Sequence, residues 1–431
     1  MPSAGPGFPS AASLRMVFAP VKSTPLRRLI PSRIVGGGDD PIFALNAEAN
    51  RRRAAGEAVV NSTLGVLLDE DLRLSTLPSV LEAYRRLPAE RGAGYAPIAG
   101  PRPFLDAVRK DVFGASPLLA HSCAVATPGG TGALALAVAN FLEVGQALLT
   151  PSFYWGPYDT IASIAGRRVE TFSMFDRDGR FHIAALEEAL ARQAATQGRA
   201  LLVLNTPCNN PTGYSLDAHD WDALVPVLHA ASQRMPLCVL MDVAYARYAQ
   251  GNPFDWVDRF APLVEDLTLL VAWSASKSFA QYGARVGACI AVETDPKELL
   301  LVESALTNGC RGTWSNGNHL GLLAITECLT DPLLSVSSMK ERVALRTMLT
   351  ARVDAFTALC KTASLRHPRY EGGFFVTVEC PQPEVAAARM RELSVFVVPV
   401  KGALRVALCS TPLASVPRLV DALATSVLQP Q

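Results

Sequence analysis

Short apolar runs alternate with longer helix-forming stretches through the middle of the chain, from about Ala124 onward. Within each run the apolar positions follow one another directly, without the alternation typical of a strand that has one face in water. Such runs, separated by helix-length segments, indicate parallel strands that helices cover on both faces. The runs that we interpret as strands lie at residues 124–127, 146–151, 199–205, 236–242, 266–273 and 287–292.

The pattern changes from about Pro332. A long helical stretch at residues 337–360 comes before shorter apolar runs at 372–380, 395–400 and 404–410. We interpret these runs as strands of a smaller unit that combines helices and strands.

Polar and glycine-rich segments follow the predicted parallel strands. GGTG at residues 129–132, NNPTG at 209–213, Asp242, and the segment from Ser274 to Lys277 each stand at or just after the end of such a strand. Because ligands gather at the carboxyl ends of the strands in a parallel sheet, we expect these segments to meet at one edge. One of them alone would be ordinary loop chemistry, but together they predict a binding site.

Composition narrows the class of protein. A chain of 431 residues with 49% hydrophobic and 18% charged residues is typical of a core-rich globular protein with two or three domains. No apolar run approaches the roughly 20 residues that span a bilayer, so we expect no membrane segment. The net charge of +1 gives no support to nucleic-acid binding. Nine cysteines without a Cys-x-x-Cys pair and six dispersed histidines predict reduced thiols and no metal site.

The first 38 residues differ from the rest of the chain. They are rich in Pro, Ser, Ala and Gly, and they contain basic residues (Arg15, Lys22, Arg27, Arg28 and Arg33) but no acidic residue. Such a composition cannot bury enough surface to fold, so we predict a flexible tail over residues 1–38. The pattern of reduced thiols, with a tail in place of a targeting segment, predicts a cytoplasmic protein. A basic, serine-rich start also resembles an organelle transit peptide, although its prolines would break the amphipathic helix expected of one.

Lys277 stands in WSASKSFAQYGARVGA, directly after a predicted buried strand. Burying a lysine is costly unless its charge is paired or its amine is used. Lys277 therefore either lies at a solvated strand end or is a working amine. Asp242 allows a similar choice, because it could cap a helix, bind a metal, or hold a proton on the ring nitrogen of pyridoxal phosphate.

The other candidate residues also allow two interpretations each. TPGGTGAL, at residues 127–134, is either a common glycine turn or a helix start that binds an anion. Arg285 could hold a phosphate or lie on the surface. Tyr245 could place its phenol over a cofactor ring, and Asn210 could start a turn or offer its amide to the ring hydroxyl. Trp155 could belong to the core or stack on a flat heterocycle.

Taken in chain order, these features resemble the class I aminotransferases of pyridoxal-phosphate fold type I, near the aspartate and aromatic amino acid aminotransferases. The motifs that carry the resemblance are TPGGTGAL, CNNPTG, DVAY, SASK with an arginine eight residues later, and RVGAC. The likeness runs from about Asp39 to the C-terminus. It implies an α/β fold with a large domain, residues 76–330, around a mostly parallel seven-stranded sheet covered by helices. Residues 39–75 and 331–431 are expected to form a smaller α+β domain.

The resemblance gives roles to individual residues around the cofactor, pyridoxal 5'-phosphate. Lys277 resembles the Schiff-base lysine and proton shuttle, and Asp242 resembles the partner of the pyridine nitrogen. Asn210 and Tyr245 resemble the donors to the phenolic oxygen of the ring. The residues that resemble the phosphate cup are Gly130, Thr131, Ser274 and Arg285.

The resemblance also implies how substrate and subunits meet. Arg405, in ALRVALCS, resembles the arginine that clamps the α-carboxylate of the substrate, and Gly65, in NSTLGVLL, resembles a glycine that lines the substrate pocket. Tyr95 resembles the tyrosine that reaches the phosphate of the neighbouring subunit, which implies a homodimer with shared active sites. Arg311 stands where dicarboxylate-specific members hold an arginine that pairs, across the subunit boundary, with the far carboxylate. It could also be a structural arginine of the interface.

One loop departs from the pattern of the family. Its aspartate enzymes have a tryptophan soon after a proline and a histidine three residues further on, whereas this chain has PSFYWGPY. Aligning Trp155 with that tryptophan lengthens the loop and puts Tyr158 in the place of the histidine, and Phe153 could be the stacking ring instead. Small residues at Ala275 and Cys208 leave room around the cofactor, which weakens the expectation of strict aspartate specificity.

The activity implied by the resemblance is pyridoxal-phosphate-dependent transamination between an acidic or aromatic L-amino acid and a 2-oxo acid such as 2-oxoglutarate. A lyase or γ-replacement enzyme of the same fold, acting on a substrate such as S-adenosylmethionine, is the alternative, because it would share the cofactor cup and the lysine. Arg311 favours a carboxylate-bearing substrate and hence transamination. A non-catalytic regulator that senses pyridoxal phosphate would need a DNA-binding helix-turn-helix, for which the first 38 residues are too rich in Pro and Gly.

Overall fold

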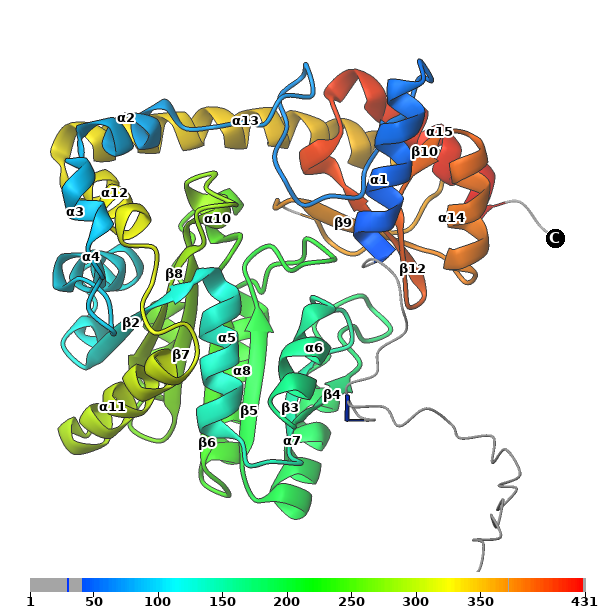
Figure 1. Cartoon of the computed structure of the whole chain (residues 1–431). Helices are drawn as coiled ribbons and strands as arrows, with labels where there is room; N and C mark the ends of the chain where they lie inside the picture. Colours follow the sequence, from blue (N-terminus) through cyan, green and yellow to red (C-terminus); the bar gives the residue numbers. More distant parts are fainter. Residues whose placement is uncertain (1–28, 31–40, 371, 429–431) are drawn as a thin grey trace, which may run out of the picture. The chain divides into compact units, whose positions relative to one another are not determined.

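The computed structural model describes residues 29–30, 41–370 and 372–428 (Figure 1). Residues 42–431 make one compact unit, and residues 1–41 belong to a separate one. Apart from Leu29 and Ile30, the tail predicted at residues 1–38 lies outside the described residues. The architecture below is that of the larger unit.

The larger unit is built on a mixed seven-stranded sheet with the strand order β2-β8-β7-β6-β5-β3-β4. Strand β8 is antiparallel to both of its neighbours, and the other pairs are parallel. The strands are β2 (Ser122–Pro128), β3 (Ala147–Pro151), β4 (Arg168–Phe172), β5 (Ala200–Asn205), β6 (Leu237–Asp242), β7 (Thr268–Ser274) and β8 (Val286–Val292). The predicted α/β fold with its mostly parallel sheet is confirmed.

Strand β4, RVETF, has no counterpart among the predicted runs. It is the last strand on its side of the sheet and pairs only with β3. An edge strand has partly exposed positions, so its sequence keeps charged residues and lacks the continuous apolar run used to find the others.

Helices cover both faces of the sheet, as Figure 1 shows. In β6, Cys238 and Leu240 belong to a core shared with α5, α6 and α11, whereas Val239 and Met241 belong to a core shared with α4, α7, α8 and α12. Because successive side chains point to opposite faces, a strand covered on both sides must be apolar throughout. These helices are α4 (Arg102–Phe113), α5 (Gly129–Phe141), α6 (Pro157–Ile164), α7 (Ile183–Gln197), α8 (Ala218–Ser232), α11 (Pro296–Gly312) and α12 (His319–Thr330).

Residues from both ends of the described chain share a second, smaller core. Strand β1 (Val60–Asn61) pairs in parallel with β10 (Val395–Phe396), and a three-stranded antiparallel sheet has the order β11-β12-β9. The remaining elements here are α1 (Pro41–Ala54), α13 (Pro332–Thr362), β9 (Phe375–Glu379), α14 (Pro383–Glu392), β11 (Val398–Val400), β12 (Ala403–Ala407) and α15 (Val416–Val427). A smaller C-terminal α+β part is therefore present, while the predicted domain boundaries stay a prediction.

Short helices complete the unit. They are α2 (Pro78–Arg86), α3 (Ala89–Ala93), η2 (Pro117–Leu119), η3 (Ala246–Tyr248), α9 (Val257–Phe260), α10 (Ala275–Ser278), η4 (Leu408–Ser410) and η5 (Leu413–Ser415). No helix of the described residues is by itself long and apolar enough to cross a membrane, and α12 with α13, bent by 91°, passes that test only as a pair. All nine cysteines are buried.

Candidate active site

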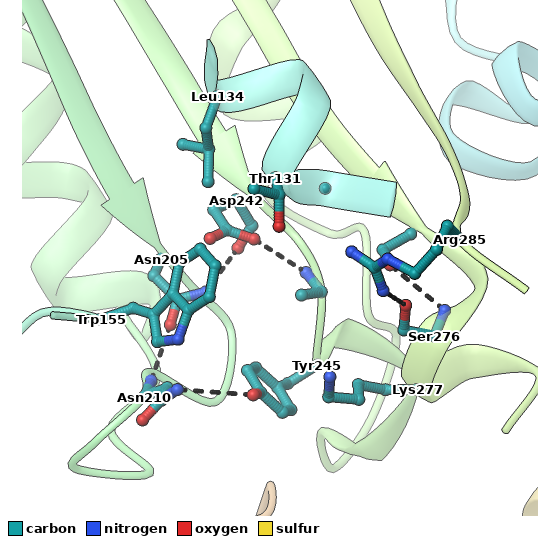
Figure 2. A pocket seen from close by; sticks show the side chains of 13 residues that line it. Thr131, Leu134, Trp155, Asn205, Asn210, Asp242, Tyr245, Ser276, Lys277 and Arg285 are labelled. Atoms are coloured by element: carbon teal, nitrogen blue, oxygen red, sulfur yellow. Dashed lines mark hydrogen bonds between the residues drawn. The ribbon is translucent and has the colours of Figure 1, made fainter. Parts of the chain in front are cut away.

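A cavity of about 160 Å³ lies where β5, β6 and β7 end and α5 begins (Figure 2). Asn205, Asp242 and Ser274 are the last residues of those strands, and α5 begins at Gly129. The sheet therefore brings together segments that are far apart in sequence, as the positions of the polar motifs predicted. The residues that line the cavity are Gly130, Thr131, Leu134, Trp155, Asn205, Asn210, Asp242, Ala244, Tyr245, Ser274, Ser276, Lys277 and Arg285.

Asp242 brings a buried carboxyl group to this cavity. Its Oδ2 accepts a hydrogen bond from the hydroxyl of Tyr158 at 2.7 Å, and its Oδ1 accepts one from the backbone N–H of Ala244 at 3.2 Å. Burial raises the pKa of Asp242, while these two hydrogen bonds and the charge of Lys277 act in the opposite direction. No helix begins at Asp242, so the side chain is not a helix cap.

Lys277 reaches into the same cavity from α10, directly after β7. Its Nζ lies 5.6 Å from the ring centroid of Tyr245 and 5.2 Å from that of Tyr282. Within the described part of the chain, no hydrogen bond or ion pair joins Nζ to another residue. Burial, followed by the charge of Arg285, lowers the pKa of Lys277 to about 8. The amine therefore holds its proton weakly, as a general base requires.

The first turn of α5 and Arg285 form a positively polarised side of the cavity. Helix α5 has no acidic residue in its first turn, and its N-cap residue, Pro128, makes no side-chain cap. The backbone N–H groups there are free to bind an anion, which the helix dipole also favours. Arg285 donates from Nη1 to Ser276 Oγ at 3.2 Å and from Nη2 to the carbonyl of Pro128 at 3.3 Å. Among the described residues it has no acidic partner.

Close packing at this side depends on Gly129. Its φ is +70°, a left-handed value that favours glycine, and a Cβ there would lie 2.6 Å from Arg285 Nη2. A Cβ on Gly287 would lie 2.5 Å from the carbonyl carbon of Gly129. Two glycines thus let the guanidinium, the strand end and the helix start come together.

An amide network connects the ends of β5 and β6. Asn205 donates from Nδ2 to the carbonyl oxygen of Asp242 at 2.8 Å, and its Oδ1 accepts from the backbone N–H of Asn210 at 2.6 Å. Asn210 in turn donates from Nδ2 to the hydroxyl oxygen of Tyr245 at 3.4 Å. The network holds the Asn210 and Tyr245 side chains at one side of the cavity, where Figure 2 shows them.

Sequence reasoning missed Asn205 and Ser276 as residues of the site. Asn205 ends RALLVLN, a run recognised as a strand, and its position at the end of that strand was the available signal. Ser276 stands between the identified Ser274 and Lys277, and only its contact with Arg285 distinguishes it from a structural serine.

Trp155, and not Phe153, lines the cavity. Phe153 packs against Phe175, with ring centroids 6.0 Å apart. Tyr158 lies edge-on to Trp155, at 5.8 Å and an interplanar angle of 89°, while its hydroxyl reaches Asp242.

Arg405 and Gly65 do not line this cavity but lie beside it, around Phe375. The Arg405 guanidinium lies 4.5 Å from the Phe375 ring centroid, and its Nη2 donates to the carbonyl of Thr63 at 2.7 Å. A Cβ on Gly65 would lie 2.6 Å from Phe375 Cζ, and Tyr245 packs edge-on against the same ring at 5.8 Å. Phe375, in the predicted strand GGFFVTVEC, is a further residue that sequence reasoning did not single out.

Tyr95 and Arg311 lie away from the cavity in this single chain. Tyr95 is 91% exposed, just after α3. Arg311 is exposed near the end of α11 and donates from Nη1 to Ser315 Oγ at 2.8 Å. Their predicted roles across a subunit boundary stay predictions.

A separate acidic cluster has spacing suitable for a metal ion. Asp217, His219 and Asp220 offer ligand atoms within 4.8 Å of one another. Arg180 Nη2 already donates to Asp217 at 2.8 Å and to Asp220 at 2.7 Å, and Arg369 pairs with both carboxylates. These arginines neutralise the cluster, which we assign to the structure of the protein.

Comparison with known proteins identifies the class to which this fold and site belong. Residues 59–423 match the family model described as aminotransferase class I and II. The chain belongs to this family, as its motifs predicted.

Individual members show how near the likeness is. Aspartate aminotransferase of Pseudomonas aeruginosa is 32% identical over 336 residues, which cover 74% of this chain and 81% of that protein. A solved aminotransferase from Anaerococcus prevotii matches with a TM-score of 0.88 and 30% identity, covering 94% of this chain and all of that one. The aromatic-amino-acid aminotransferase of Burkholderia pseudomallei, solved covalently bound to pyridoxal phosphate, matches with a TM-score of 0.77 and 25% identity, covering 93% of this chain and all of that one.

Proposed function

We propose that this protein is an aminotransferase that uses pyridoxal phosphate to exchange the amino group of an L-amino acid with a 2-oxo acid such as 2-oxoglutarate. The observation that carries the proposal is the Lys277 amine, which reaches into the cavity opposite the buried Asp242 without an ion-pair partner among the described residues. Family membership supports the same reaction class.

The cavity offers a matching group for each part of pyridoxal phosphate. The phosphate would be held by the α5 N-terminus, Arg285 and the hydroxyl-bearing side chains of Thr131, Ser274 and Ser276. Gly129 supports this fit, because a Cβ there would occupy the space of the Arg285 guanidinium. Gly130, near the start of α5, lines the cavity without a side chain.

The remaining lining residues match the ring of the cofactor. Asp242 would hold the ring nitrogen protonated, and Asn210 and Tyr245 would donate to the phenolic oxygen. Trp155 would cover one face of the ring. When bound, the cofactor supplies an aldehyde that carries the amino group and a ring that accepts the electron pair released at the substrate Cα.

The side chains of the protein control where protons move. With a pKa of about 8, roughly a tenth of Lys277 is neutral at pH 7, far more than for an ordinary lysine, so its Nζ can remove the proton from the substrate Cα. Asp242 would keep its negative charge by pairing with a protonated ring nitrogen of the bound cofactor, and that pairing would compensate for the cost of burying the carboxylate.

Arg405 would bind the α-carboxylate of the amino acid. Stacking on Phe375 and the hydrogen bond to Thr63 fix the direction of its guanidinium. A fixed carboxylate sets which Cα bond points toward Lys277, and orientation of this kind contributes much of the rate enhancement of enzymes. Gly65 lets the Phe375 ring pack against its backbone, because a Cβ there would lie 2.6 Å from Phe375 Cζ.

The proposed substrates are acidic or aromatic amino acids, and the proposed assembly is a homodimer. The named relatives include aspartate and aromatic-amino-acid aminotransferases, so both classes are candidates. In a dimer, the exposed Tyr95 would reach the phosphate, and Arg311 the far carboxylate of an acidic substrate, in the site of the other subunit. We also retain the cytoplasmic location and the domain division at residues 39–75, 76–330 and 331–431 as proposals.

The decisive experiment compares the purified protein with the variants Lys277→Ala and Lys297→Ala after loading with pyridoxal phosphate. We expect the native protein to show the visible absorbance band of the bound cofactor and to transaminate. We expect Lys277→Ala to lose the band and more than about 1,000-fold in turnover, because no other amine replaces its proton transfer. Lys297→Ala, an exposed lysine of α11, should retain both.

The same samples distinguish transamination from elimination. An amino acid added alone should release one equivalent of 2-oxo acid per site and then stop until a second 2-oxo acid is supplied. Continued turnover on the amino acid alone would instead identify a lyase. Full activity of Lys277→Ala, or a native protein that takes up no pyridoxal phosphate, would refute the proposed function.

A further inference from the structure

The hydroxyl of Tyr158 donates a 2.7 Å hydrogen bond to Oδ2 of Asp242 from behind the cavity wall. Tyr158 belongs to α6 and is 1% exposed, so this contact is fully shielded from water. Its ring packs edge-on against Trp155, which lines the cavity, and stacks on Tyr154 at 6.0 Å. Tyr158 therefore contacts both the Asp242 carboxylate and the Trp155 ring without lining the cavity itself.

We propose that Tyr158 is a positioning residue of the active site, whose hydroxyl orients the Asp242 carboxylate and whose ring seats Trp155. The proposal rests on the proposed function, because it assigns Tyr158 a role through the residue that would bind the ring nitrogen of pyridoxal phosphate. A carboxylate that faces a cavity can rotate about its terminal torsion, and a short hydrogen bond to one oxygen removes that freedom.

Tyrosine at this position provides a donor that does not titrate near neutral pH. Burial, followed by the charge of Asp242, raises the pKa of Tyr158 well above its usual value. The sequence resemblance puts a histidine here in the aspartate enzymes of the family, and an unperturbed histidine changes charge near pH 6.5. Tyr158 therefore supports Asp242 through a neutral O–H group across the whole neutral range.

The charged and titratable groups around Asp242 determine the direction of the effect. Tyr158 faces it from α6, Lys277 from α10, and Tyr245 from the turn after β6, beside the backbone N–H of Ala244. The hydrogen bond from Tyr158 favours the ionised carboxylate, so removing it raises the pKa of Asp242. Loss of cofactor binding on acidification should then begin at a higher pH.

The test compares Tyr158→Phe with Tyr214→Phe, a matched control. Tyr214 is 2% exposed and donates a 2.8 Å hydrogen bond to a buried carboxylate, that of Asp220, away from the cavity. Both variants lose a buried hydroxyl–carboxylate bond, so both should lose thermal stability. The dissociation constant of pyridoxal phosphate, measured by titrating apoprotein from pH 5 to 9, should rise about tenfold only in Tyr158→Phe. The pH below which cofactor affinity falls should also be higher only in Tyr158→Phe.

A second variant, Tyr158→His, keeps a donor but makes it titratable. We expect cofactor affinity near that of the native protein with a new pH dependence between about pH 6 and 7. If Tyr158→Phe and Tyr214→Phe bind the cofactor equally well at every pH, or if Tyr158→His shows the pH profile of the native protein, the positioning role is wrong. Tyr158→His also serves as the deciding variant if Tyr158→Phe does not fold. Failure of the native protein to bind pyridoxal phosphate would refute the proposed function instead, so the two failures are distinguishable.

Discussion

Single residues at the cavity adopt conformations and charge states that stability alone does not favour. Lys277 reaches in with no ion-pair partner among the described residues, Asp242 holds a buried carboxyl group, and Arg285 has a left-handed φ of +53°. Strained and desolvated groups of this kind concentrate at functional sites. Because such groups coincide at one sheet edge, we interpret the cavity as an active site.

We predict that Gly129→Ala loses both stability and cofactor affinity. Replacing it by alanine puts a Cβ at a φ of +70° and within 2.6 Å of Arg285 Nη2. The left-handed conformation costs an alanine about 1–2 kcal/mol in the free energy of unfolding. The added Cβ would also push the Arg285 guanidinium away from the place where it would bind the phosphate. We therefore expect the dissociation constant of pyridoxal phosphate to rise at least about tenfold.

Gly198 provides the control for backbone strain. It ends α7 with a φ of +68°, and no atom lies within 4 Å of a Cβ placed there. Denaturant unfolding should show similar losses for Gly198→Ala and Gly129→Ala, whereas cofactor titration should separate them. Equal cofactor affinity in the two variants would show that Gly129 serves only the turn.

At the scale of elements, strand register explains why the polar residues meet. Asn205 lies opposite Asp242, which lies opposite Ala272, while Ser274 pairs with Gly287 on β8. Parallel strands end together at one edge, and the antiparallel β8 brings the turn that carries Arg285 to that same edge. Strand order and direction therefore assemble the cavity, and helix α5 supplies its N-terminus.

The segment 62–70, which carries Gly65, is bound to α13 through the side chain of Arg352. Arg352 is fully buried and donates to the carbonyls of Leu68, Leu408 and Cys409, as well as to Glu70. It thus connects the substrate side of the site to a long helix.

We predict that Arg352→Met loosens this segment. Losing the donor for three carbonyl groups, two of them buried, should lower the free energy of unfolding by about 2–4 kcal/mol. We expect KM for the amino acid to rise several-fold with the dissociation constant of the cofactor unchanged, because the phosphate seat lies on other elements. The exposed Lys340 on the same helix gives the control Lys340→Met, expected within about 0.5 kcal/mol of the native protein. A matching loss of cofactor affinity in Arg352→Met would show a general defect instead.

For the assembled protein, the proposed homodimer would complete the site. Tyr95 and Arg311 are exposed and do not line the cavity of their own chain, so their proposed functions require a second copy. In a symmetric dimer each site would then combine Lys277 of one subunit with Arg311 of the other.

Mixed dimers test this arrangement. Arg311→Ala should weaken acidic substrates far more than aromatic ones, and Lys277→Ala should be inactive on both. A hybrid of the two variants holds one site with both native residues if Arg311 acts across the boundary, so we expect about half of the native activity on an acidic amino acid. Two differently tagged, co-expressed chains allow the hybrid to be purified and assayed. Activity of the hybrid no higher than half that of the Arg311→Ala dimer would refute a role of Arg311 across the subunit boundary.

The fold class, the family and most of the residues that line the cavity could be predicted from the amino-acid sequence. Continuous apolar runs predicted the doubly covered strands, because a strand buried on both faces has no polar position to spare. Glycines, Asp242 and Lys277 were recognisable because each is a costly or unusual residue next to a core strand. The edge strand β4 was missed because its exposed positions remove that signal.

Which side chains touch could be read only from the folded chain. That Trp155 rather than Phe153 lines the cavity, that Tyr158 bonds to Asp242 across 84 positions in the chain, and that Asn205 joins β5 to β6 depend on register and helix placement. Phe375 acquires importance only where Arg405, Gly65 and Tyr245 converge on its ring. Contacts between distant positions are set by the packing of whole elements, and no local pattern of residues records that packing.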